Sequence, residues 1–317
     1  MTVRSDDDAR ESRRSSPQRD RRLRRWFAWL MLGSFGAATA CYIDYRRDCA
    51  RLRATAQLVV AAAQSPADRV IALLHWVFAN QSTKENPRYF LFPRLRATPC
   101  QVLETGGDCA DKSRLLSAML REVGIPASMA MCFDPRTGHS THTIVVAVIA
   151  PGTDMVVDAV YDIFFPRPEQ RGYYGLSDLR RDATILPHRL DTLCAERPRS
   201  HPIHYYNRVS AVYSHATCMN WEKNGLTRIL RDFLVRNDGD ALYTIARPLV
   251  LEEPKLLVSL AAALVGIGAG SIYAVMAPGA LRHQGDVGKS RVPVRGSADA
   301  YDSANTRFGG GMSVCGR

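Results

Sequence analysis

One cysteine at the predicted start of a helix carries the clearest chemistry in this sequence. Cys109 lies in the glycine-led segment 106–112, and the apolar residues after it recur every three or four positions as far as Val123, as in an amphipathic helix. Asp108 can cap the first turn of this helix, and Gly124 can end it. At a helix N-terminus, unpaired backbone N–H groups and the positive end of the helix dipole favour a thiolate over a thiol. We therefore expect Cys109 to be a nucleophile.

A cysteine nucleophile needs a base, and a third group usually orients that base. The segments 142–149 and 155–161 predict an antiparallel hairpin, in which His142 starts the first strand and Asp158 lies on the second. A hairpin that closed symmetrically would put these two side chains on opposite faces, whereas one bulge or an odd-length loop would bring them together. We expect such an irregularity. Asp162 is four residues after Asp158, so in a continued strand its side chain would point to the same face. It is the alternative partner of the histidine.

An ordered set of motifs surrounds these residues. Its members are Gly-Asp-Cys at 107–109 at the start of a helix, Gly-Ile-Pro at 124–126 after it, His142 at the start of a strand, and Asp158 on the next strand. The set resembles the transglutaminase-like superfamily of papain-type cysteine enzymes over roughly residues 65–165. The resemblance implies an α+β fold, in which the cysteine-bearing helix packs on an antiparallel sheet. It also implies a catalytic triad, with Cys109 as nucleophile, His142 as general base and acid, and Asp158 as the group that orients His142.

Other interpretations of the nearby residues stay open. The backbone N–H of Cys109 is a candidate donor for an oxyanion hole, and the side chain of Gln101 is a second candidate. A metal site built from Cys132, His139 and His142 is disfavoured, because no paired Cys-x-x-Cys spacing accompanies it. The sequence also has no Asp-x-Asp-x-Asp-Gly loop that would bind calcium. We expect neither a metal nor a cofactor.

Two uncharged apolar runs predict membrane anchoring. The run 27–43 follows a basic segment, and the run 256–277 is 22 residues long, which is enough to cross the hydrocarbon core as a helix. A cleaved signal peptide is the alternative for the first run. Gly266 and Gly270 give the second run a small-residue face that could pack on another helix. We therefore expect two transmembrane helices, at 26–45 and 255–277.

The distribution of charge predicts an orientation for these helices. The formal net charge is +11, and nine arginines fall within the first 25 residues. No aromatic side chains are interleaved with these arginines before Trp26, which argues against nucleic acid as a partner. The C-terminal tail is also basic, with Arg282, Lys289, Arg291 and Arg295. Because basic flanks stay in the cytoplasm, we expect both termini to be cytoplasmic and the central domain to be periplasmic, in a bacterial inner membrane.

The predicted organisation follows from these features. The segments are a disordered basic tail at 1–25, a first transmembrane helix at 26–45, a transglutaminase-like domain at 46–165, an α-rich extension at 166–254, a second transmembrane helix at 255–277 and a flexible C-terminal tail at 278–317. Six of the eight cysteines fall between the two apolar runs without dense disulfide spacing, and Cys194 and Cys218 either pair or remain buried thiols.

These observations favour a membrane-anchored cysteine enzyme that transfers acyl groups, either a peptidase or amidase or a transglutaminase-like enzyme. Its expected partners are membrane lipid and a peptide or protein substrate in the cell envelope. The alternative is a non-catalytic, membrane-anchored binding or assembly module that uses the same fold.

Overall fold

The computed structural model describes residues 17–276, apart from 135–136, 138, 169–171, 207–212, 222–224, 238–241 and 243–244. The predicted tail at 278–317 and the first 16 residues of the basic tail lie outside this part of the chain. A helix begins at Pro17, so residues 17–25 of the predicted disordered tail are helical. These residues extend the apolar helix that follows, and the arginines among them are good helix formers.

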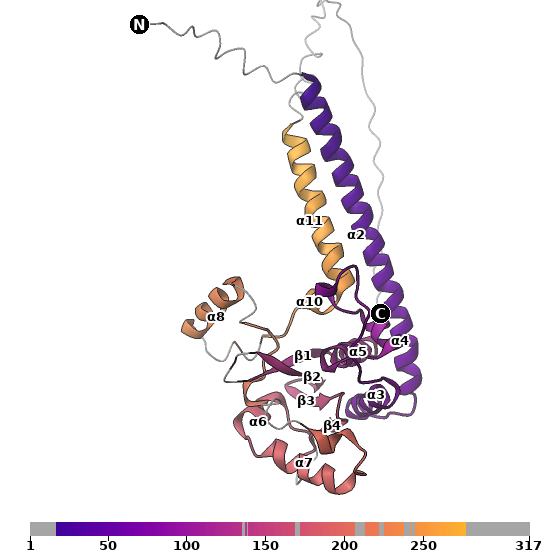
Figure 1. Cartoon of the computed structure of the whole chain (residues 1–317), viewed down its shortest axis with the longest axis vertical. Helices are drawn as coiled ribbons and strands as arrows, with labels where there is room; N and C mark the ends of the chain where they lie inside the picture. The colour runs from indigo at the N-terminus through magenta and orange to yellow at the C-terminus, as the bar shows by residue number, and fades with distance from the viewer. Residues whose placement is uncertain are drawn as a thin grey trace, which may run out of the picture. The chain divides into compact units, whose positions relative to one another are not determined.

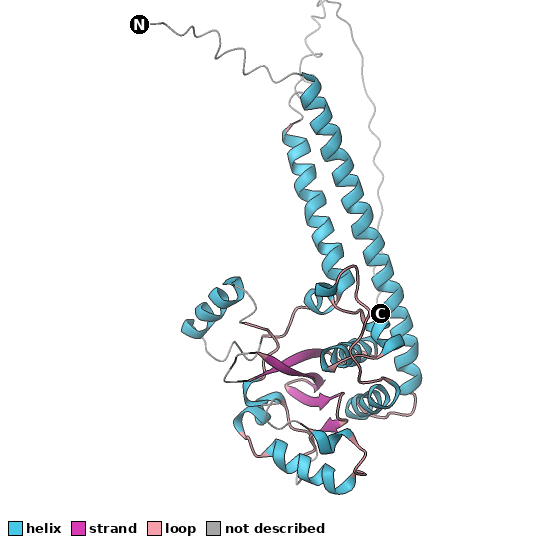
Figure 2. Ribbon diagram, in the orientation of Figure 1, coloured by secondary structure: helices cyan, strands magenta, loops and turns pink. Residues whose placement is uncertain are grey.

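Four antiparallel strands form one sheet in the order β1-β2-β3-β4 (Figure 2). They are β1 (Ala127–Phe133), β2 (Ser140–Ala150), β3 (Thr153–Asp158) and β4 (Ile163–Phe164). The helices shown in Figure 1 are α2 (Pro17–Val59), α3 (Pro66–Asn80), α4 (Pro99–Thr105), α5 (Cys109–Glu122), α6 (Leu176–Arg181), α7 (Ile185–Glu196), α8 (Gly225–Asn237), α10 (Leu249–Glu252) and α11 (Pro254–Val275). Three short 3₁₀ helices are η1 (Pro93–Leu95), η2 (Pro202–Tyr205) and η3 (Tyr213–His215). The predicted α+β fold is therefore confirmed.

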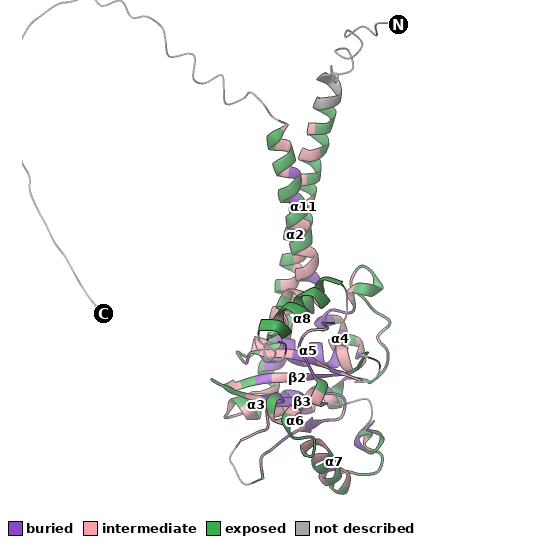
Figure 3. Cartoon of the chain, turned by 90° about the vertical axis from the view of Figure 1, so that its left-hand side faces the viewer, coloured by how far each residue is buried: buried purple, intermediate pink, exposed green. Residues whose placement is uncertain are grey.

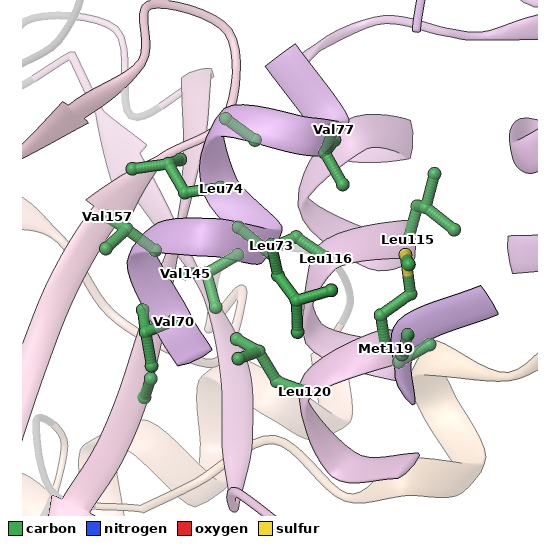
Figure 4. Packing of buried hydrophobic residues seen from close by; sticks show 14 of the residues in the cluster. Val70, Leu73, Leu74, Val77, Leu115, Leu116, Met119, Leu120, Val145 and Val157 are labelled. Carbon is green, nitrogen blue, oxygen red and sulfur yellow. The ribbon is translucent and has the colours of Figure 1, made fainter. Parts of the chain in front are cut away.

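The sheet separates two buried clusters because alternate strand residues point to opposite faces. On one face, Val145 and Val157 pack with the apolar residues of α3 and α5 (Figure 4). The contacting helix residues are Val70, Leu73, Leu74, Val77, Leu115, Leu116, Met119 and Leu120. On the other face, Ile144 and Val156 are buried with residues of α6 and α7. Each fully buried leucine contributes about 2 kcal/mol to folding, so the first cluster holds α5 firmly on the sheet.

The predicted hairpin contains the irregularity that its side chains require. Val148 pairs with Asp154, whereas Ala150 pairs with Thr153, so the register shifts across Ile149. The shift confirms the expected bulge. Because of this shift, the side chains of His142 and Asp158 point to the same face of the sheet. This is the face that packs against α6 and α7.

Helix α2 is a single helix of 43 residues that continues past the predicted transmembrane segment. Its C-terminal part enters the first cluster through Leu52 and Ala56, which are both buried. Near this part, Lys255 Nζ lies 2.7 Å from Asp44 and 2.6 Å from Asp48. Helix α2 therefore serves both as an apolar helix and as a wall of the folded domain.

The N-terminal part of α2 packs along α11. A Cβ atom added to Gly266 would lie 3.2 Å from the ring of Phe35, and one added to Gly270 would lie 3.1 Å from the sulfur of Met31. Ser259 Oγ also donates a 2.8 Å hydrogen bond to the carbonyl oxygen of Ala38. Both helices are long and apolar enough to cross a membrane, and little of their apolar windows is buried.

Candidate active site

The start of α5 places Cys109 by local chemistry. Asp108 Oδ1 accepts a 2.9 Å hydrogen bond from the backbone N–H of Asp111, which caps the helix as predicted. A Cβ atom at Gly107 would collide with the side chain of Asp111, so a glycine is required just before the cap. Gly106 has a φ of +76°, a conformation that glycine adopts at little cost. Cys109 is consequently the first residue of the helix, where its own N–H group has no intrahelical acceptor.

His142 and Asp158 form a buried pair on neighbouring strands. Their Nε2 and Oδ2 atoms are 2.6 Å apart, and the His142 side chain is only 7% exposed. The other oxygen of Asp158 accepts a 3.0 Å hydrogen bond from the backbone N–H of Val160. Cys109 lies close enough to His142 to help raise the pKa of the imidazole. Because Nε2 is engaged by Asp158, Nδ1 is the ring nitrogen that can exchange a proton with Cys109.

The surroundings of His142 favour its charged form. Burial lowers the pKa of this imidazole, but the charge of Asp158, the hydrogen bond to Asp158 and the contact with Cys109 together outweigh burial and raise the pKa above its ordinary value. A protonated imidazole next to a sulfur favours a thiolate–imidazolium pair. The structure therefore brings together all three residues that the sequence analysis selected.

Two tyrosines extend this arrangement behind Asp158. Tyr213 Oη donates a 3.2 Å hydrogen bond to Asp158 Oδ2, and Tyr206 Oη donates a 3.2 Å hydrogen bond to Tyr213 Oη. Burial raises the pKa of both phenols, so they stay protonated and act as donors. The ring of Tyr161 lies 5.7 Å from that of His142 and 4.5 Å from that of Tyr206.

The sequence analysis missed this tyrosine chain. It selected neither Tyr206 nor Tyr213. No local signal marks Tyr213, because it follows Asp158 by 55 residues in a region of weak periodicity. The α-rich extension thus contributes directly to the surroundings of the histidine–aspartate pair.

Lys112 is a second group that the sequence analysis did not select. It lies one helical turn after Cys109 and is almost fully buried, with Nζ 5.7 Å from the centre of the Phe78 ring. Burial lowers the pKa of its ammonium group to about 8, and the charge of Asp158 opposes this shift. Its spacing of three residues from Cys109 was visible in the sequence, but its burial was not.

Asp162, the alternative partner, is engaged elsewhere. Its two carboxylate oxygens contact His75 Nδ1 and Arg197 Nη2, the latter at 3.1 Å. Its φ of +56° lies in the left-handed region, which aspartate tolerates better than most residues. Asp158, and not Asp162, therefore lies beside His142.

The remaining candidates have structural roles. Gln101 caps α4, because its Oε1 accepts a 2.9 Å hydrogen bond from the backbone N–H of Thr98, so its side chain is not directed to an oxyanion. Cys194 and Cys218 are free thiols. Within the described residues, no group of three or more His, Cys, Asp or Glu side chains could hold a metal ion.

Comparison with known proteins finds one family model that matches part of the chain. Residues 53–162 match the family model of the transglutaminase-like superfamily. A solved structure described as "a putative protease from Parabacteroides distasonis" is similar at 17% sequence identity and a TM-score of 0.26, and the similarity covers 40% of this chain and 30% of that one. No curated protein matches the chain.

The matched segment contains Cys109, His142 and Asp158, together with strands β1 to β3 of the sheet. Residues 53–162 are therefore the part of this chain that is similar to the transglutaminase-like superfamily.

Proposed function

We propose that the protein is a membrane-anchored cysteine enzyme that transfers acyl groups from a peptide or glutamine amide. The observation that carries the proposal is the buried contact between His142 and Asp158, with Cys109 near His142 at the N-terminus of α5. A buried histidine held by an aspartate on one ring nitrogen, with a thiol nearby, has the parts of a nucleophile, a base and an orienting group.

The reaction follows from these positions. The thiolate of Cys109 attacks the carbonyl carbon of the amide and forms a carbon–sulfur bond. His142 then gives its proton to the departing nitrogen as the carbon–nitrogen bond breaks, which leaves a thioester on Cys109. Water or a second amine attacks the thioester, His142 takes its proton, and Cys109 leaves as a thiolate. Asp158 stabilises the imidazolium in both half-reactions and keeps the ring in place.

The first turn of α5 supplies a donor for the developing oxyanion. The N–H group of Cys109 is directed away from the helix, and the helix dipole adds positive potential at this point. Release by water would make the enzyme a peptidase or amidase, and release by an amine would make it a cross-linking enzyme. Hydrolysis is the simpler outcome, since it needs no second binding site.

Membrane anchoring is the second half of the proposal. Little of the apolar windows of α2 and α11 is buried, unlike those of a helix in a soluble core, and a helix of 22 residues is about 33 Å long. Such a surface is unfavourable in water and favourable in lipid. The basic tails would then remain in the cytoplasm, which would place the domain in the periplasm of a bacterial cell.

The test of the catalytic proposal is the pH dependence of iodoacetamide labelling in the full chain, read peptide by peptide by mass spectrometry. We expect Cys109 to react at pH values well below about 8.5, the pKa of a free cysteine. We expect this reactivity to fall in a His142→Ala variant. Cys49 is an internal control in every sample, because burial raises the pKa of its thiol to about 11.

Two results would contradict the proposal. One is a Cys109 thiol that labels only at alkaline pH, and the other is a labelling profile that His142→Ala leaves unchanged. Either would favour the non-catalytic binding or assembly module.

A further inference from the structure

Helix α8 (Gly225–Asn237) exposes an apolar face. Leu226, Ile229, Leu230 and Phe233 follow the spacing of a single helix face, with Leu226 77% and Phe233 61% exposed. None of the residues of α8 is buried, and Figure 3 shows this helix as mostly exposed. A contiguous exposed face of large apolar side chains marks an interaction surface.

The other side of α8 is basic. The helix carries three arginines, Arg228, Arg231 and Arg236, against one acidic residue, Asp232. All four lie outside the apolar face, and Arg231 Nη2 lies 2.7 Å from Asp232 Oδ1. A helix with one large apolar face, a basic remainder and little net hydrophobicity fits the boundary between lipid acyl chains and anionic headgroups.

The length of α8 also argues for a covering surface. A helix of 13 residues is only marginally stable in water unless its apolar face packs on something. Leu226 and Phe233 remain largely exposed within the described part of the chain. A partner surface that covered this face would therefore stabilise α8.

The position of α8 in the chain identifies that partner. Sixteen residues separate Asn237 from Pro254, where α11 begins. A fully extended connection of this length spans at most about 58 Å. Four of its residues form α10, which shortens this reach, so α8 stays within reach of the membrane surface from which α11 would emerge. We propose that α8 lies in the interface of the same bilayer, with its apolar face among the acyl chains and its arginines among anionic headgroups. The inference rests on the proposed membrane anchoring in one respect, which is that the anchoring keeps α8 close to the bilayer.

A second copy of the chain is the other possible occupant. Two α8 helices that paired through their apolar faces would leave their arginines facing outward, without a counter-charge. The charge pattern instead complements an anionic lipid surface.

Photo-crosslinking of the full chain in vesicles tests the inference. Benzoylphenylalanine would replace Phe233 on the apolar face and, in a matched control, Val235, which is 54% exposed on the opposite side of the helix. A third variant with the probe at Leu264 of α11 reports whether the chain is embedded in lipid. The vesicles contain phosphatidylcholine and phosphatidylglycerol, and lipid adducts are measured by mass spectrometry.

We expect several-fold more lipid adduct at position 233 than at position 235, together with strong lipid labelling at position 264. Equal adducts at 233 and 235, or none at 233 while 264 is labelled, would overturn the inference and leave the anchoring intact. A crosslink from 233 to a second copy would overturn it in favour of dimerisation. Loss of lipid adducts at all three positions would overturn the anchoring and the inference together.

Discussion

Two histidine–aspartate pairs lie in this domain, and they differ in what surrounds them. His142 and Asp158 are buried, with a thiol on one side and a phenol on the other. His75, in contrast, has a 44% exposed side chain, and its partner Asp162 is shared with Arg197. The same two residue types therefore form a candidate catalytic pair in one place and, in the other, an ion cluster in which a buried aspartate contacts two partly exposed side chains.

The difference lies in the third partner and in water. The guanidinium of Arg197 contacts the second oxygen of Asp162, so His75 shares this carboxylate with a second partner. Asp158 instead accepts hydrogen bonds from neutral donors, Tyr213 and the N–H group of Val160, beside its contact with His142. Water screens an exposed pair far more than a buried one. A histidine–aspartate contact is thus not evidence of catalysis until its surroundings are known.

The sharpest test of this comparison exchanges each histidine for alanine. We expect His142→Ala to lower kcat/KM on a peptide amide by about 10⁵-fold, because the base and acid of the reaction is lost. His75→Ala should leave kcat/KM within about threefold of the wild type, since surface pairs contribute little. Steady-state kinetics of the two variants in the same detergent checks the prediction. A large loss in His75→Ala would make the two pairs functionally equivalent and contradict the comparison.

The second test exchanges each aspartate for asparagine. Asp158→Asn should lower kcat/KM by about 10³- to 10⁴-fold, because the imidazolium loses its counter-charge and its orientation. Asn is also tolerated at positive φ, so Asp162→Asn should keep the backbone at φ +56° and retain activity. Its expected cost is to stability, through the lost pairing with Arg197. Activity measured beside the melting temperature separates the two effects, and an inactive but stable Asp162→Asn would contradict the assignment.

The third test uses the pH dependence of stability. The pKa of His142 is raised in the folded state, so the stability it contributes is fully present below about pH 6.5 and is lost as pH rises through the raised folded value. Asp158→Asn removes the cause of the shift. We therefore expect the gap in melting temperature between wild type and Asp158→Asn to be larger near pH 6 than above pH 9. A gap that did not change with pH would show that the imidazolium does not stabilise the fold.

The smallest effect concerns the phenol behind Asp158. Tyr213→Phe removes one hydrogen bond to the carboxylate at nearly constant volume, and we expect a loss of about 1 kcal/mol, or about fivefold in kcat/KM. Tyr205→Phe is the matched control, because Tyr205 is exposed. Kinetics across a pH series should also show a displaced profile for Tyr213→Phe alone. Identical profiles in both variants would make Tyr213 a packing residue.

Features that depend on neighbouring residues could be predicted from the sequence. The cap at Asp108, the glycine before it and the apolar period of α5 are local, and together they determine where Cys109 lies. The parity of the hairpin was also predictable, because a strand has a period of two and a bulge is needed for His142 to meet Asp158. These features follow from backbone geometry, which short stretches of sequence already restrict.

Only the tertiary structure decided the rest. The alternation of side chains along a strand allowed either Asp158 or Asp162 to be the partner of His142. Which of them it is depended on the position of β4 and on the contact of Asp162 with Arg197, 35 residues away. The burial of Lys112 and the hydrogen bond from Tyr213 arise in the same way, from packing between segments that are distant in the chain. Local sequence carries no record of such contacts, because their energy comes from groups that meet only after the chain has folded.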